Sequence, residues 1–230
     1  MSLFMNLTGE TYEFTALGQG VLIALVILAV FTTCFFTDKD KKNRISVKQL
    51  VFSAMCVALA MVTSSIKLWR MPTGGSITLF SMFFITFVGY LYGLRAGLTA
   101  AVAYGMLQLI FNPYVVSIPQ LIIEYPLAFG ALGLSGIFSN SKYGMCKGYL
   151  TGIVGRMFFA VLSGVIFFGQ YAPENMNAFT YSFVYNGVYI ITEGVLTAVI
   201  LCVPAVRYVF KKVRYLANED DVRARLSQTA

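Results

Sequence analysis

Long apolar runs, each about the length of a membrane-spanning helix, dominate this sequence. The first covers residues 17–36, and about twenty such residues are enough to cross a bilayer core of about 30 Å as a helix. Only 12% of all residues are charged, against roughly 25% in an ordinary soluble domain, so a soluble fold would leave too much apolar surface in water. We therefore predict an all-α, polytopic membrane protein, with a six-helix bundle and one extra N-terminal transmembrane helix. The six further apolar segments lie at residues 47–66, 77–93, 97–111, 117–138, 148–170 and 178–209.

Charged and polar stretches divide the chain into three parts. Residues 1–46 form an N-terminal extension with the first apolar run and a basic linker, residues 47–212 form the six-helix domain, and residues 213–230 form a polar tail. We interpret the first run as a retained helix rather than a signal peptide, because two glutamates and no Lys or Arg precede it. The chain after Arg207 is polar and basic, and we expect it to end in a loosely held helix.

The distribution of basic residues predicts how the protein lies in the membrane. If the linker at residues 38–48 is cytoplasmic and the helices alternate, most Lys and Arg side chains are cytoplasmic and only Lys67 and Arg70 lie outside. Cytoplasmic loops carry an excess of Lys and Arg in membrane proteins. This places the N-terminus outside and the C-terminus in the cytoplasm. The outward-facing loops are then those at residues 67–76, 112–117 and 171–178.

Several function classes are excluded by what the sequence lacks. The chain contains no His, so it has no His-based catalytic triad and none of the common zinc sites. It also lacks the GxxxxGK[ST] phosphate loop, the GxSxG nucleophile elbow and the HExxH metal motif. The net charge of +7 could suggest nucleic acid, but the basic residues lie in short loops between apolar runs. We therefore expect no enzyme activity, no metal or cofactor and no nucleic-acid partner, and we expect the lipid bilayer to surround the protein.

Three ionisable side chains, Glu124, Arg156 and Glu193, lie inside the apolar spans, where a charge is costly and marks a candidate functional site. One interpretation is an ion pair between Glu124 and Arg156 that only holds helices together. The other is that Glu124, near the outer end of its span, binds a cationic ligand that enters from outside. Glu193 lies deeper, and we expect it to support the site from below or to pair with Arg156.

Aromatic side chains gather at the outer ends of the spans. Aromatic faces around one carboxylate suit a flat, positively charged molecule, through stacking and cation–π attraction. The same residues would also fit the aromatic belt that membrane proteins place at the lipid–water interface. Tyr181, Tyr185 and Asn186 favour a site, because their spacing puts them near one helix face and the Asn186 amide needs partners. The full set comprises Trp69, Tyr104, Tyr114, Tyr125, Phe168, Tyr171, Tyr181 and Tyr185.

Ala54 and Ala58 are four residues apart in the first helix of the six-helix domain. Small residues at this spacing let two helices pack closely in lipid. The pair predicts either packing within this protein or a docking face for a separate membrane partner.

Six short motifs occur in order along the six-helix domain: Gly74–Thr78 (GGSIT), Leu94–Leu98 (LRAGL), Tyr104–Gln108 (YGMLQ), Gln120–Phe129 (QLIIEYPLAF), Phe167–Glu174 (FFGQYAPE) and Tyr181–Asn186 (YSFVYN). Together they resemble the thiamine-specific substrate-binding (S) component of energy-coupling factor (ECF) transporters, the ThiT family. The resemblance implies a six-helix S component in a prokaryotic plasma membrane, which captures thiamine at its outward-facing end. It also implies a transmembrane coupling subunit and two ABC-type ATPases as partners, which supply the energy.

The resemblance implies roles for individual residues as well. Glu124 matches the family's glutamate that meets the positively charged thiazolium ring, and Tyr125 and Tyr114 match neighbouring positions. Tyr181 and Asn186 match the pair that contacts the pyrimidine ring. The remaining implied roles are stacking on the ligand for Tyr104 and Phe168 and docking on the coupling subunit for Ala54 and Ala58. Separately, we expect the loop from Trp69 to Gly75 to act as a lid, because its glycines permit motion.

One position departs from the family pattern. The family's fifth helix usually offers a His to the ligand, and Ala160 occupies that position here. Thiamine therefore has alternatives within the same class: a thiamine precursor such as hydroxymethylpyrimidine, or another, neutral vitamin. An alternative from a different class is a structural or assembly membrane protein, in which the ion pair between Glu124 and Arg156 only locks helices. A membrane enzyme is the remaining alternative.

Overall fold

The computed structural model describes residues 5–8, 11–15, 46–71 and 75–218, together with 17, 18, 21 and 24. The predicted N-terminal helix at residues 17–36 thus falls, apart from four single positions, outside the described residues, as does the tail beyond residue 218. At the N-terminal end of the described chain, strands β1 (Met5–Thr8) and β2 (Thr11–Phe14) pair in antiparallel fashion.

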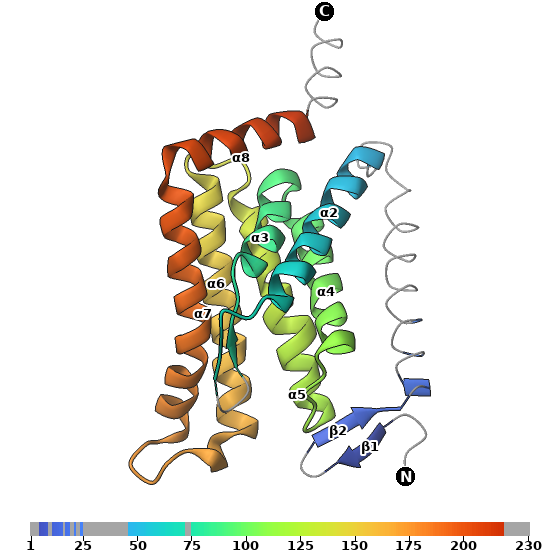
Figure 1. The fold of residues 1–230 in the computed structure, drawn as a ribbon, viewed down its shortest axis with the longest axis vertical. Coiled ribbons are helices and arrows are strands. Elements are labelled where there is room, and N and C mark those ends of the chain that lie inside the picture. Colours follow the sequence, from blue (N-terminus) through green and yellow to red (C-terminus); the bar gives the residue numbers. More distant parts are fainter. Residues whose placement is uncertain are drawn as a thin grey trace, which may run out of the picture.

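The helical segments follow one another in the order that the apolar runs predict (Figure 1). In the described part of the chain, five of them are long and apolar enough to cross a membrane, and Ser81–Tyr92 is a shorter apolar helix. The prediction of an all-α membrane bundle with six helical segments is therefore confirmed for this part. The segments are α2 (Val47–Ser65), α3 (Ser81–Tyr92), α4 (Leu94–Phe111), a composite helix (Ile118–Phe138), α6 (Gly144–Phe167) and α7 (Ala178–Cys202).

The composite helix changes its winding twice along its length. It begins as α5 (Ile118–Ile122), widens into a π-helix, η2 (Ile123–Phe129), and narrows into a 3₁₀-helix, η3 (Ala131–Phe138). Pro126 lies inside the π-helix and has no N–H to donate, so the regular α-helical bonding cannot continue through it. Widened turns of this kind recur at functional sites. This one carries Glu124 and the neighbouring Tyr125.

The core of the bundle is built around α3. Its side chains Met82, Phe83, Ile85 and Val88 are each at most 1% exposed, because α2, α4, η3 and α6 all pack against this helix. Small residues allow this density. A Cβ atom added to Gly133 of η3 would lie only 2.5 Å from the backbone of α4.

The last predicted span, residues 178–209, is wrong at its end. The helix α7 stops at Cys202, and a separate helix, α8 (Pro204–Ala217), lies across the end of the bundle (Figure 1). Val203 between them has φ −64° and ψ 125°, an extended conformation, because the ring of Pro204 disfavours helical geometry in the residue before it. The chain therefore turns at Val203 instead of continuing along the axis of α7.

The described part of the tail, α8, packs on the bundle, and the end of the tail, where we expect a loosely held helix, lies outside the described residues. The ring of Phe210 lies 4.8 Å from that of Phe83, centroid to centroid. Arg214 donates from Nη2 to the carbonyl oxygen of Ser139 at 2.6 Å, and its guanidinium lies 4.3 Å from the centroid of the Tyr90 ring. Because α8 ends at Ala217, it continues past residue 212, where we expected the polar tail to begin.

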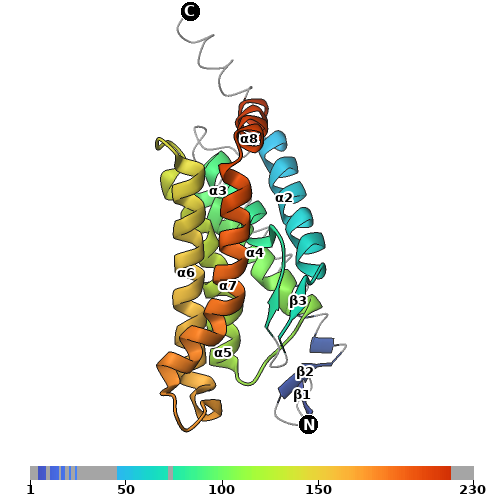
Figure 2. The same cartoon turned by 60° about the vertical axis from the view of Figure 1, so that its left-hand side comes forward.

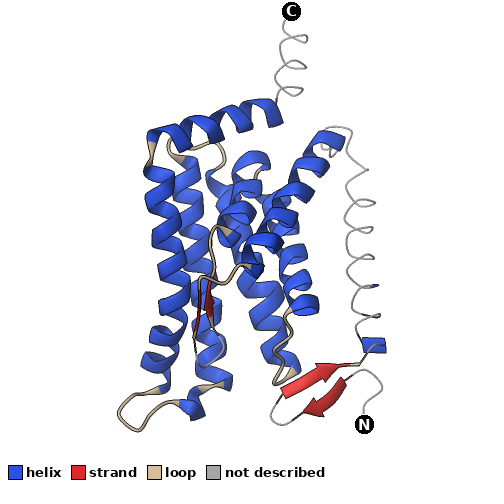
Figure 3. Ribbon diagram, viewed as in Figure 1, coloured by secondary structure: helices blue, strands red, loops and turns tan. Residues whose placement is uncertain are grey.

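A short hairpin interrupts the helical pattern between α2 and α3. Its strands are β3 (Trp69–Arg70) and β4 (Ser76–Ile77), with Trp69 opposite Ile77. The hairpin lies among the helices, beside α7, rather than at the end of the bundle (Figure 2, Figure 3). The loops that precede α5 and α7 lie at the end of the bundle opposite α8.

Candidate functional site

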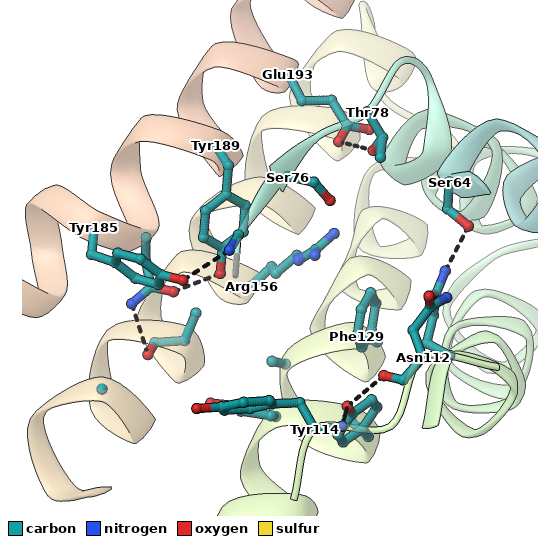
Figure 4. Close-up of a pocket in the computed structure, with 18 of the residues that line it drawn as sticks. Ser64, Ser76, Thr78, Asn112, Tyr114, Phe129, Arg156, Tyr185, Tyr189 and Glu193 are labelled. Atoms are coloured by element: carbon teal, nitrogen blue, oxygen red, sulfur yellow. Dashed lines mark hydrogen bonds between the residues drawn. The ribbon is translucent and has the colours of Figure 1, made fainter. Parts of the chain in front are cut away.

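A cavity of about 690 Å³ lies inside the bundle, in the volume range typical of small-molecule sites. Side chains from α2, α3, α4, the composite helix, α6 and α7 line it, together with Ser76 of the hairpin (Figure 4). All the predicted ligand-binding and supporting side chains except Trp69 meet there. They are Tyr104, Tyr114, Glu124, Tyr125, Arg156, Phe168, Tyr181, Asn186 and Glu193.

Glu124 is half-buried in the wall of the cavity, and neutral donors hold its carboxylate. Oε2 accepts a hydrogen bond from Nε2 of Gln120 at 2.6 Å, and Oε1 accepts one from the Ser163 hydroxyl at 2.8 Å. Neither donor carries charge. Within the described part of the chain, no Lys or Arg forms an ion pair with this carboxylate, so its negative charge remains available to a ligand.

The segment that carries Glu124 is braced against the loop before it. The Tyr125 hydroxyl donates to the carbonyl oxygen of Asn112 at 3.0 Å and accepts from the backbone N–H of Tyr114 at 2.8 Å. Gln120 is fully buried and donates from Nε2 to the carbonyl oxygen of Tyr114 at 3.1 Å, besides its bond to Glu124. Tyr125 therefore holds the segment that carries Glu124 against the preceding loop, and its hydroxyl already donates one hydrogen bond and accepts another.

Two groups of aromatic rings form walls of the cavity. The rings of Tyr114 and Phe168 stack with centroids 5.9 Å apart and an interplanar angle of 30°. On α7, Tyr181 and Tyr185 stack at 6.1 Å and 26°. Tyr104 also lines the cavity but is only 1% exposed. Its hydroxyl accepts from Nε2 of Gln108 at 2.7 Å.

The amide of Asn186 forms hydrogen bonds through both its nitrogen and its oxygen. Its Nδ2 donates to the carbonyl oxygens of Ser182 at 2.9 Å and Ala160 at 3.3 Å, and its Oδ1 accepts from the Tyr189 hydroxyl at 2.6 Å. The close approach of α6 and α7 makes these bonds possible, because a Cβ atom on Gly164 would overlap Ser182. Ala160, the position at which the resemblance implies a His, contributes its backbone carbonyl to the site.

Arg156 does not form the ion pairs that the sequence suggested. Its guanidinium lies over the ring of Phe129, 4.4 Å from the centroid, and points into the middle of the cavity (Figure 4). Both oxygens of Glu124 and both of Glu193 bond to other groups, and no ion pair of Arg156 occurs among the described residues. The helix-locking ion pair between Glu124 and Arg156 is therefore absent from this structure.

Glu193 supports the cavity at the start of α3. Oε2 accepts from the hydroxyl of Thr78 at 2.6 Å, and Oε1 accepts from the hydroxyl of Ser81 at 2.8 Å and the backbone N–H of Met82 at 3.1 Å. A carboxylate at a helix N-terminus satisfies free N–H groups and interacts favourably with the helix dipole. Glu193 therefore braces the start of α3, and among the described residues it makes no ion pair with Arg156.

The hairpin reaches the cavity through Gly75 rather than through Trp69. The backbone N–H of Gly75 donates to the hydroxyl of Tyr185 at 2.9 Å, and a Cβ atom at this position would lie 2.9 Å from the ring of Tyr189. Trp69 is 59% exposed and does not line the cavity. The remainder of the predicted lid, residues 72–74, lies outside the described residues.

Sequence reasoning missed several of the groups that hold the site together. Gln120 and Ser163, which bond Glu124, and Tyr189, which bonds Asn186, were not singled out. Spacing offered a signal for two of them: Gln120 is four residues before Glu124, and Tyr189 is three after Asn186, so each pair shares a helix face. Ser163 comes from another helix, and no local pattern indicates that contact.

The alanines expected to dock on a partner lie away from the cavity. Ala54 and Ala58 are both exposed on α2, among other exposed apolar side chains of the same helix such as Val51, Met55 and Val62. They are therefore not used in packing within the described part of this chain.

Comparisons with known proteins agree on one family. The family model described as thiamine transporter protein (Thia_YuaJ) matches residues 50–212. A thiamine transporter ThiT from Bacillus subtilis (strain 168) is 31% identical over 166 residues, which cover 66% of this chain and 85% of the relative. A thiamine transporter ThiT from Lacticaseibacillus paracasei is 32% identical over 126 residues, 47% of this chain and 63% of that protein.

A solved structure resembles the bundle as well. The structure titled as native-SAD phasing for ThiT from Listeria monocytogenes superposes with a TM-score of 0.62 at 26% sequence identity. The match covers 74% of this chain and 96% of the solved chain. It includes nearly all of the relative. The family match and these relatives together show that the chain belongs to the thiamine transporter protein (Thia_YuaJ) family.

Proposed function

We propose that this protein is the S component of an ECF-type vitamin transporter and that its cavity binds thiamine. One observation carries the proposal: the Glu124 carboxylate faces an aromatic-lined cavity and is held only by the neutral donors Gln120 and Ser163. A half-buried negative charge of this kind gains most from a cationic partner. Thiamine brings a flat thiazolium cation. The relatives of this protein in the family carry the name thiamine transporter.

The two ends of the ligand would use different walls. The thiazolium ring lies beside Glu124 and stacks with the pair Tyr114 and Phe168, whose rings are already parallel to within 30°. The aminopyrimidine ring lies toward α7, where Tyr181 offers a ring face and Asn186 offers Oδ1, which has a second lone pair. Neutral ligands and hydroxymethylpyrimidine would leave Glu124 without a cation, which favours thiamine over these alternatives.

Uptake requires partners, because this chain has no phosphate-binding loop of its own. A transmembrane coupling subunit would dock on the exposed face of α2 through Ala54 and Ala58, and two ABC-type ATPases would supply the energy. The loops before α5 and α7 would face outward and α8 the cytoplasm, with the chain beginning outside the plasma membrane and ending inside. The protein itself makes no chemical change to the vitamin.

Isothermal titration calorimetry of the purified protein in detergent tests this function. The unmodified protein should bind thiamine, and Glu124→Gln should weaken binding by at least about tenfold, since a hydrogen-bonded charge contact contributes about 1.5–3 kcal/mol. Gln keeps the shape of the side chain, its amide oxygen can still accept from Gln120, and its amide N–H can donate to the Ser163 hydroxyl, so the variant should still fold. Glu174→Gln, at an exposed position in the loop before α7, is the matched control and should bind normally.

Hydroxymethylpyrimidine serves as the second titrant. Its binding should be weaker than that of thiamine and unaffected by Glu124→Gln, because it carries no cation. Equal thiamine affinity in the Glu124→Gln variant and the unmodified protein would contradict the proposed role of Glu124. If hydroxymethylpyrimidine gives heat of binding and thiamine gives none, the ligand is the precursor and not thiamine.

A further inference from the structure

A second large depression, a groove of about 850 Å³, runs between α6 and α7. Its lining is entirely apolar or weakly polar and carries no charged side chain. Ile153 and Leu201 form its floor and are at most 8% exposed, whereas Val154, Phe158 and Val195 form its sides and are 55–62% exposed. The groove shares none of its lining residues with the thiamine cavity.

The groove exists because α7 presents small residues toward α6. Gly194 has no side chain, and a Cβ atom there would lie 2.9 Å from Cδ1 of Ile153, so the helices approach closely at this level. Ala198 follows one turn later in the lining. Larger side chains of both helices project on either side of this contact and leave an elongated space between them.

Two cations lie at one end of the groove. Lys147 is exposed and precedes Val154 and Phe158 by seven and eleven residues, which places it on the same face of α6. From α8, Arg207 donates from Nε to the carbonyl oxygen of Leu201 at 3.1 Å, and its Nη2 lies 4.0 Å from Sγ of Cys202. Within the described residues, neither cation forms an ion pair.

We propose that this groove binds one acyl chain of an anionic phospholipid, whose headgroup is held by Lys147 and Arg207. The lining on α6 runs from Cys146 to Val165, which is about 28 Å of helix, close to the thickness of a bilayer core of about 30 Å. The cations are therefore at headgroup depth and the apolar groove at acyl-chain depth. Basic residues near a membrane surface attract anionic lipids. The site does not depend on the proposed function or on the orientation of the termini.

Native mass spectrometry of the purified protein tests this site. The protein is mixed with phosphatidylglycerol or phosphatidylcholine of identical acyl chains, and retained lipid is counted. We expect about fivefold more retention of phosphatidylglycerol, the effect of roughly one basic residue at the surface. Lys147→Gln should reduce this preference, with Lys142→Gln in the adjoining loop as the control. Ala198→Phe should reduce retention of both lipids, with Val199→Phe, exposed on α7 outside the groove, as the control.

Equal retention of the two lipids by the unmodified protein, or an unchanged preference in Lys147→Gln, would overturn the proposal. The same holds if Ala198→Phe leaves lipid retention intact but disrupts assembly with the coupling subunit, since the groove would then receive a helix of that partner. Near-UV circular dichroism shows whether Ala198→Phe is folded. Lys147→Gln changes only an exposed side chain, so it tests the headgroup contact even if the larger substitution fails to fold.

Discussion

At the scale of single residues, the site consists of a few reactive groups held in place by many ordinary ones. Glu124 is oriented by Gln120 and Ser163, and Asn186 is oriented by Tyr189 and the carbonyl of Ala160. These bonds fix the direction of each side chain before a ligand arrives. Such preorganisation lowers the entropic cost of binding.

Tyr189→Phe should separate orientation from direct contact. The substitution removes the hydroxyl that donates to Oδ1 of Asn186 at 2.6 Å but keeps the ring against Gly75. A lost hydrogen bond of about 1 kcal/mol corresponds to roughly fivefold weaker thiamine binding. Calorimetry should show the same loss for hydroxymethylpyrimidine, unlike Glu124→Gln, and none for the control Tyr208→Phe on the exposed face of α8. Unchanged affinity for both ligands would mean that Asn186 needs no support from Tyr189.

At the scale of elements, the close packing of α6 on α7 decides where Asn186 lies. Gly164 and Gly187 both lie inside these helices, yet their surroundings differ. A Cβ atom at Gly164 would overlap Ser182, while one at Gly187 would be 3.4 Å from the nearest atom, the Cε of Met157. A larger side chain would therefore clash at Gly164, whereas Gly187 has room for one more methyl group.

Gly164→Ala should destabilise the protein by about 1–3 kcal/mol, the usual cost of overpacking, and should weaken thiamine binding because α7 is pushed away from Ala160. Gly187→Ala is the matched control and should be neutral or slightly stabilising, since Ala favours helix over Gly. Thermal unfolding in detergent gives the comparison. Similar unfolding temperatures for the two variants would show that α6 and α7 adjust more freely than the structure implies.

At the scale of the whole molecule, the ligand cavity and the exposed face of α2 are separate surfaces. Ala58 is exposed on α2, whereas Ser64, near the end of the same helix, faces the cavity and accepts a hydrogen bond from Gln108 at 2.8 Å. Binding and docking should therefore respond to different substitutions.

Ala58→Trp should abolish docking and leave binding intact. The added indole would hold a partner helix away from α2, so co-purification with the coupling subunit and thiamine uptake into vesicles should both fall sharply. Calorimetry should give an unchanged thiamine affinity. Val199→Trp, at another exposed position on α7, controls for the bulk of the new side chain. Full uptake by Ala58→Trp would exclude this face of α2 as the docking surface.

The sequence by itself determined the class of fold and most members of the candidate site. Runs of apolar residues must form helices in lipid, because every backbone polar group there needs an internal partner. Ionisable residues inside such runs are few, so Glu124, Arg156 and Glu193 could be named one by one. The break at Pro204 was missed by the predicted span over residues 178–209, although a proline disfavours helical geometry in the residue before it.

The tertiary structure alone decided which of these residues meet and what each one bonds. The sequence offered Arg156 as a partner for either glutamate, but Glu124 bonds Ser163 from another helix, and Glu193 bonds the start of α3. Trp69 was close to the motifs along the chain and yet lies outside the cavity. Hydrophobic period and spacing report which face of a helix a residue occupies, whereas partners across helices depend on how closely glycine and serine let the helices approach.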